Sequence, residues 1–178
     1  MIRLFIAIDL PETAKEELGR LCFGLPGARW VEPEQIHLTL RFIGEVDGGL
    51  FHEIRSGLEH VECPAFPLTL KGLGCFPPRG EPHVLWVGVE KSEPLLRLRK
   101  KVDVRLAGIG VAPEKRKFSP HVTLARLKET PLSRLTNFLS GNGLFVLPEF
   151  AVNRFHLYSS LLTPKGPVHR LEVSYPLG

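Results

Sequence analysis

His37-Leu38-Thr39-Leu40 and His121-Val122-Thr123-Leu124 are the two stretches of the chain that decide its fold. Each places a histidine and a threonine two residues apart within an apolar run, which predicts a β-strand. Side chains two apart on a strand project from the same face, so each copy presents an imidazole beside a hydroxyl. We expect the two copies to face each other across a cleft and to form one anion site.

The surroundings of the two motifs also repeat. The first unit is predicted as strand 2–8, helix 11–22, the His37 strand, helix 50–61 and strand 66–75. The second is predicted as strand 83–89, helix 92–106 with Ser92 as its N-cap, the His121 strand, helix 130–141 and strand 145–152. His121 follows His37 by 84 positions, and Pro94 follows Pro11 by 83. Two units in the same order indicate internal duplication, which predicts two lobes related by an approximate two-fold axis.

The predicted organisation is a single domain over residues 1–178. Its repeat units span 1–76 and 82–153, and an extra hairpin at 154–176 is expected to pair with a sheet edge. The composition, 43% hydrophobic and 24% charged, is typical of a soluble globular protein. We find neither a long apolar run nor a secretory leader, and the three cysteines include no C-x-x-C pair. We therefore expect a cytoplasmic protein with free thiols and no membrane contact, and separately we expect a monomer.

The residue types of the motifs suit acid–base chemistry on a phosphodiester. An unperturbed imidazole titrates near pH 6.5, so one histidine can donate a proton while its counterpart accepts one. The two threonine hydroxyls can donate to non-bridging phosphate oxygens. We expect no cofactor.

Other readings of the motifs remain open. Two strands with incidental histidines would produce the same pattern without a site. A zinc site is disfavoured because neither motif contains a carboxylate and threonine is a poor zinc ligand. We find no G-x-S-x-G motif, P-loop or dinucleotide fingerprint.

The net charge of +4 is compatible with nucleic acid but does not by itself predict it. The segment Lys115-Arg116-Lys117 precedes the second motif and is either a phosphate-binding loop or an ordinary solvated one. Five cations on the third predicted helix are interpreted mostly as its solvent face, namely Arg97, Arg99, Lys100, Lys101 and Arg105. Among the other histidines, His52 and His60 are expected at the surface, and His156 with Tyr158 at exposed strand positions.

The chain resembles the two-histidine phosphoesterase superfamily, whose paired H-x-T-x signature matches both motifs. The flanking residues are similar to those of the RNA 2′,3′-cyclic phosphodiesterases, also called 2′-5′ RNA ligases (LigT-like). The stretches that carry this likeness are residues 3–8, Trp30, residues 40–46, residues 118–120, Ala125-Arg126 and residues 157–168. The resemblance covers essentially the whole chain and implies a bilobal α+β fold whose antiparallel-rich sheets flank a central groove.

The resemblance also implies an activity, the hydrolysis of a 2′,3′-cyclic phosphate at an RNA end to a 2′-phosphate. It assigns His37 as proton donor to the leaving oxygen, His121 as proton acceptor from water, and Thr39 and Thr123 as phosphate ligands. Phe42 and Arg126, each five residues after a histidine, would stack on a base and contact phosphate. Strict alternation would place each of these residues on the strand face opposite its histidine. To reach the site they need either a β-bulge or a position at the strand end.

Related functions stay open from the sequence. The same acid and base can run the reverse reaction, a reversible 2′-5′ ligation of RNA ends such as tRNA fragments. Small cyclic nucleotides are an alternative substrate class. A single-stranded RNA-binding module without catalysis is the alternative of a different class.

Overall fold

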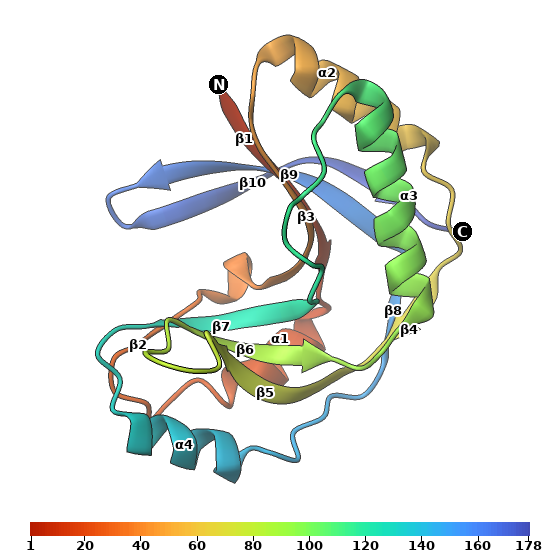
Figure 1. Ribbon diagram of the computed structural model, residues 1–178. Coiled ribbons are helices and arrows are strands. Elements are labelled where there is room, and N and C mark those ends of the chain that lie inside the picture. The colour runs from red at the N-terminus through yellow and green to blue at the C-terminus, as the bar shows by residue number, and fades with distance from the viewer.

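The computed structural model describes all 178 residues, and it is an α+β structure (Figure 1). The strands are β1 (Ile2–Asp9), β2 (Ala28–Trp30), β3 (His37–Val46), β4 (Phe66–Leu68), β5 (Leu70–Phe76), β6 (Val84–Val89), β7 (His121–Leu127), β8 (Phe150–Val152), β9 (Arg154–Thr163) and β10 (Gly166–Pro176). The helices are α1 (Glu12–Gly19), α2 (Gly48–Gly57), α3 (Glu93–Ile109) and α4 (Leu132–Gly141), with two 3₁₀ turns, η1 (Pro33–Gln35) and η2 (Leu58–His60).

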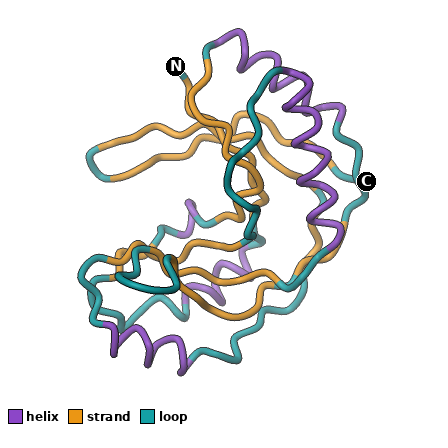
Figure 2. Tube along the Cα trace, in the orientation of Figure 1, coloured by secondary structure: helices purple, strands orange, loops and turns teal.

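The two motif strands, β3 and β7, are neighbours at the centre of an eight-stranded sheet. The strand order is β10-β9-β1-β3-β7-β6-β5, with β2 paired to β7. β3 and β7 share a single antiparallel residue pair, Leu38 with Val122, so the two halves of the sheet are free to diverge on either side of it. Figure 1 shows the result as an open C. Figure 2 shows strands along the inner side of the C, with α2, α3 and α4 along its outer side.

The third strand of each repeat crosses to the other half of the sheet. β5 of the first repeat pairs with β6, and β9, which the sequence placed in the extra hairpin, takes the equivalent position for the second repeat by pairing with β1. The short strands that precede them, β4 and β8, pair with each other in a separate two-stranded sheet. Each half of the sheet therefore contains strands of both repeats, and neither repeat can form its sheet without the other.

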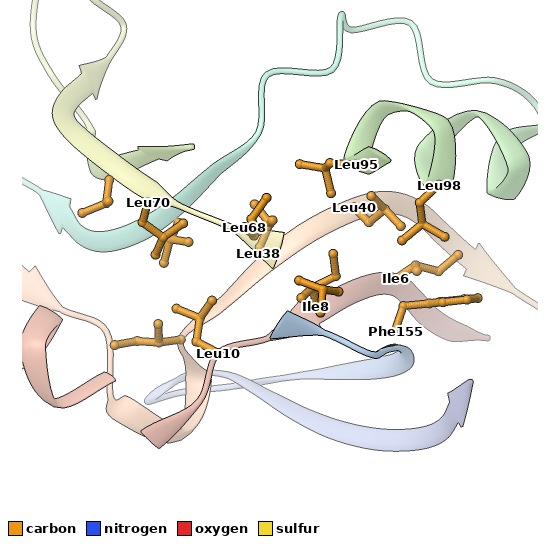
Figure 3. Packing of buried hydrophobic residues seen from close by; sticks show 14 of the residues in the cluster. Ile6, Ile8, Leu10, Leu38, Leu40, Leu68, Leu70, Leu95, Leu98 and Phe155 are labelled. Atoms are coloured by element: carbon orange, nitrogen blue, oxygen red, sulfur yellow. The ribbon is translucent and has the colours of Figure 1, made fainter. Parts of the chain in front are cut away.

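The buried core lies on the helix side of the sheet. Ile6, Leu38, Leu40 and Leu98 are fully buried, and Figure 3 shows these side chains between the central strands and α3. Burying one such side chain contributes roughly 1.5–3 kcal/mol. Because Leu38 and Leu40 must face this core, strand alternation turns His37 and Thr39 to the inner side of the C.

The helix α3 illustrates how local sequence sets an element. The Ser92 hydroxyl accepts a hydrogen bond from the Leu95 N–H at 3.2 Å, which confirms the predicted N-cap. Gly110 ends the helix in the left-handed conformation at φ 98°, which glycine adopts without strain. No helix in the protein combines the length and apolarity needed to span a lipid bilayer.

Three predicted elements differ from the structure. Strand 66–75 is divided at Thr69, whose carbonyl accepts from the Glu90 N–H, and its two parts join different sheets. Strand 145–152 is reduced to β8, because Pro148 has no N–H to continue a ladder. The helix expected over 11–22 ends at Gly19, and Leu21 and Cys22 continue it only as tight turns.

Candidate active site

The sheet brings both His/Thr pairs to one face, which we call the histidine face. The antiparallel pair Leu38–Val122 places His37 in line with Thr123 and Thr39 in line with His121. All four side chains are half-buried and point away from the core, while Leu38 and Val122 are buried beneath them. The duplicated motif therefore produces one cluster of two imidazoles and two hydroxyls.

Both imidazoles are oriented by a backbone carbonyl two residues earlier in the chain. Nδ1–H of His37 donates to the Gln35 carbonyl at 2.7 Å, and Nδ1–H of His121 donates to the Ser119 carbonyl at 2.7 Å. Since a carbonyl only accepts, Nδ1 carries the proton and Nε2 of each neutral ring keeps its lone pair. The Thr39 hydroxyl donates to Nε2 of His37 at 3.0 Å.

Aromatic rings surround each histidine. Phe5 stacks on His37 with ring centroids 5.0 Å apart, and His169 lies edge-on to His37 at 5.3 Å. In the other half, Phe76 lies edge-on to His121 at 5.0 Å. The buried Phe5 ring and its neighbours restrict water at His37.

Burial lowers the pKa of His37 from 6.5 to about 4, and the neighbouring His169 adds to the decrease. The Gln35 carbonyl and the Asp9 carboxylate act in the opposite direction because both favour the imidazolium form. In the free protein His37 is therefore neutral near pH 7.

Matched β-bulges bring Phe42 and Arg126 onto the histidine face. In β3 the register with β1 shifts between Thr39 and Arg41, so Phe42 pairs with Phe5 and shares its face. In β7 the register with β6 shifts between Thr123 and Ala125, so Arg126 aligns with Val84 on the same face as Trp86. Both side chains are exposed. Strict alternation would have turned them to the face opposite the histidines, and the bulges reverse this.

The bulge in β3 is held by charged side chains from the second repeat. The Arg99 guanidinium donates to the Leu40 carbonyl at 2.6 Å, and the Phe42 N–H donates to Glu114 at 2.7 Å. Arg99 also bonds to Asp103 and Glu114, and Arg41 bonds to Asp103. In β7 the equivalent carbonyl of Leu124 accepts from the Val31 N–H at 2.8 Å.

Arg99 corrects the interpretation of the cations on α3. Four of the five are exposed as expected, but Arg99 is only 8% exposed. The signal in the sequence was its spacing, four residues after Leu95 and three before Val102, which places Arg99 on the buried stripe of the helix. Lys100, Lys101 and Arg105 line a surface hollow of about 780 Å³ between α2 and α3, which does not include the two histidines.

A second group of polar residues lies beside His37. Asp9 is the β1 partner of His37, and its carboxylate accepts a hydrogen bond from the Tyr158 hydroxyl at 2.5 Å. Nε2 of His156 lies 3.4 Å from the same carboxylate, and its Nδ1 is 2.8 Å from the Ser174 hydroxyl. The expectation that His156 and Tyr158 are exposed was wrong: His156 is 4% exposed because Asp9 and Ser174 pack against its ring, and Tyr158 is half-buried.

The remaining candidates lie at the surface. His52 and His60 are exposed, as predicted, and so are Lys115, Arg116 and Lys117 in the loop before His121. No three or more His, Cys, Asp or Glu side chains cluster as a metal site would require. All three cysteines are free thiols.

The fold and the two-histidine face define a class of phosphoesterase, and comparison with known proteins agrees. The family model described as LigT like Phosphoesterase matches twice, at residues 8–86 and 87–169, and each match contains one His-x-Thr motif. The chain belongs to this family.

Named relatives and solved structures support the assignment. An RNA 2′,3′-cyclic phosphodiesterase of Thermotoga maritima is 38% identical over 96% of this chain and 92% of its own length. One of Aeropyrum pernix is 40% identical over 83% of this chain and 84% of its own. A crystal structure from Thermus thermophilus superimposes with a TM-score of 0.83 at 28% identity, covering 98% of this chain and 97% of that one. E. coli LigT complexed with 3′-AMP superimposes with a TM-score of 0.79 at 26% identity, covering 99% and 98%.

Proposed function

We propose that the protein hydrolyses the 2′,3′-cyclic phosphate at the end of an RNA chain, producing a 2′-phosphate and a free 3′-hydroxyl. The observation that carries this proposal is the placement of two half-buried imidazoles, one from each repeat, on the same face as two threonine hydroxyls. The curated relatives bear the name of this activity.

The reaction requires one proton to be removed and one to be supplied. A water oxygen forms a bond to phosphorus while His121 Nε2 takes a proton from that water. The bond between phosphorus and the ribose 3′ oxygen breaks, and His37 Nε2–H donates its proton to that oxygen. Histidines from opposite halves of the sheet suit this in-line displacement because attacking and leaving oxygens lie on opposite sides of phosphorus.

His37 must be protonated before it can act as the donor, although its pKa is low in the free protein. A bound phosphodiester brings a negative charge next to the ring, and a nearby opposite charge favours the imidazolium. We therefore propose that the substrate itself promotes the protonation of His37. This coupling would prevent a buried charge from persisting when the site is empty.

The surrounding residues complete the proposed site. The hydroxyls of Thr39 and Thr123 donate to the non-bridging oxygens, where negative charge is held in the transition state. Phe42 offers its exposed ring to the terminal base, and Arg126 offers its guanidinium to phosphate. The matched bulges support these last two roles because they place both side chains on the face of the histidines.

Product analysis on an oligoribonucleotide ending in a 2′,3′-cyclic phosphate, with a chelator present, tests the proposal. We expect a 2′-phosphate product from the wild type, and a loss of kcat of at least about 100-fold in His37→Ala and in His121→Ala. His52→Ala, which removes an exposed histidine, is the matched control. Full activity in either single variant would overturn the two-histidine mechanism.

The test also separates catalysis from simple RNA binding. A non-catalytic module would bind the oligonucleotide but leave its cyclic end intact. We further propose that the natural substrates are RNA fragments such as those of tRNA, and that the protein acts as a cytoplasmic monomer. The free thiols support a reducing compartment.

A further inference from the structure

The β9–β10 hairpin carries a concentration of exposed apolar side chains that the proposed chemistry does not use. Leu161, Leu162, Val168 and Leu171 are 69%, 62%, 49% and 48% exposed. Figure 1 shows the hairpin extending beyond the rest of the sheet as one arm of the open C. Large apolar groups gathered on a protruding element indicate a binding surface.

The strand register assigns these side chains to two faces. Tyr158 pairs with Phe5 of β1, so its face is the histidine face. Alternation then places six residues on this side of the hairpin, and we call them the hairpin face: Tyr158, Ser160, Leu162, Pro167, His169 and Leu171. Leu161 and Val168 pair with each other and point to the opposite side.

The hairpin face is continuous with the site around His37. His169 lies 4.8 Å from Phe5, ring to ring, and Phe5 lies 6.2 Å from Phe42. Ring contacts therefore link the exposed Phe42, through the buried Phe5, to His169 on the hairpin face.

Charge at the hairpin tip favours an anionic ligand. The Arg29 guanidinium, from β2, donates to the Lys165 carbonyl at 2.5 Å, which places two cations at the turn. Arg29 is also the β2 partner of Arg126 in β7. None of the six residues of the hairpin face carries a carboxylate. Apolar side chains next to cations match a single-stranded nucleic acid, whose bases stack and whose phosphates need neutralising.

We propose that the hairpin face binds the nucleotide that precedes the cyclic-phosphate end, with its base against Leu162 and Leu171. This inference rests on the proposed function, since the terminal nucleotide must occupy the site between the two histidines. The RNA chain then leaves that site from the 5′ side of the terminal ribose. The hairpin makes the protein selective for RNA ends over cyclic mononucleotides.

Two substrates and two adjacent leucines test the proposal. The substrates are adenosine 2′,3′-cyclic monophosphate and the trinucleotide ApApA ending in the same cyclic phosphate. For Leu162→Ser we expect the ratio of kcat/KM for trinucleotide over mononucleotide to fall about fivefold, the weak end of the effect of losing one stacked base. Leu161→Ser removes an equally large and equally exposed side chain from the opposite face, and its ratio should match the wild type.

The outcomes distinguish this inference from its alternatives. The hairpin subsite would be overturned if this ratio of kcat/KM values were the same in the wild type and in Leu162→Ser. It would also be overturned if the ratio fell equally in Leu162→Ser and Leu161→Ser, and in both cases the proposed hydrolysis would stand. Sedimentation that shows a wild-type dimer, disrupted by both substitutions, would assign the hairpin to a second copy of the chain instead. If the wild type turned over neither substrate, the proposed function itself would fail.

Discussion

The hydroxyl of Tyr158 donates to the carboxylate of Asp9 over 2.5 Å, and this bond connects β9 of the second repeat to β1 of the first. Asp9 is also the cross-strand partner of His37. A carboxylate would repel a phosphate in the same site, so its presence needs a reason. Its charge favours the protonated form of His37, which the donor step requires.

Replacing this carboxylate should weaken catalysis. The Asp9 carboxylate raises the pKa of His37, so this pKa should be lower in Asp9→Asn. A smaller fraction of His37 is then protonated in the enzyme–substrate complex. We expect kcat/KM at pH 7 to fall severalfold, because fewer enzyme–substrate complexes then hold the protonated donor. Glu149→Gln, which neutralises an exposed carboxylate, is the control. Unaltered kinetics in Asp9→Asn would remove Asp9 from the mechanism.

The depressed pKa of His37 predicts a pH dependence of stability. The unfolded chain binds this proton near pH 6.5, and the folded protein binds it near pH 4. The contribution of the neutral His37 ring to the free energy of unfolding is therefore fully present above pH 6.5. It is lost as the pH falls from 6.5 to 4. Urea unfolding should show a larger loss over this window in the wild type than in His37→Gln, by at most about 3 kcal/mol. Parallel curves for the two proteins would contradict the low pKa.

The same residue offers a direct measurement of substrate coupling. Histidine titration followed by NMR should place the midpoint of His37 well below 6.5 in the free protein. Adding 3′-AMP, whose phosphate carries negative charge, should raise it. His52 is exposed and serves as an internal reference. A midpoint that does not respond to the ligand would show that the phosphate does not reach His37.

Removing Arg99 should destabilise the protein. In Arg99→Ala, Asp103 and Glu114 lose ion-pair partners and the Leu40 carbonyl loses its donor. Both carboxylates are partly exposed and keep Arg41 as a partner, so the main cost is the buried Leu40 carbonyl left without a donor, about 1–3 kcal/mol. Lys100→Ala on the exposed side of α3 should change the free energy of unfolding by less than about 0.5 kcal/mol. Chemical denaturation compares the two, and similar midpoints would show that Arg99 does not hold the bulge.

Phe42 should matter for substrate binding and little for stability, because its ring is 62% exposed. In Phe42→Ala we expect KM for a cyclic-ended oligonucleotide to rise by about fivefold or more, since stacking on one base contributes roughly 1–3 kcal/mol. Phe42→Trp should restore binding. Phe23→Ala, at a ring that is 71% exposed elsewhere, should leave KM unaltered.

The main elements could be predicted because their patterns are local. The alternation around Leu38 and Leu40 predicts a strand with one buried side, and Ser92 with Pro94 predicts a helix start. The incorrect predictions concern residues whose structure depends on contacts with distant parts of the chain. The predicted strand 66–75 is divided because its two parts pair with different partners, β8 and β6, and His156 is buried because Ser174 and Asp9 flank it.

The duplicated His/Thr pairs, the α+β order of elements and the family resemblance can all be read from the amino-acid sequence. That Phe42 and Arg126 share the face of the histidines follows from the folded chain alone. Their orientation depends on a register shift against β1 and β6, and on Arg99, Glu114 and Val31 bonding to the backbone that each bulge leaves unpaired. These partners are distant along the chain, so no local periodicity encodes them.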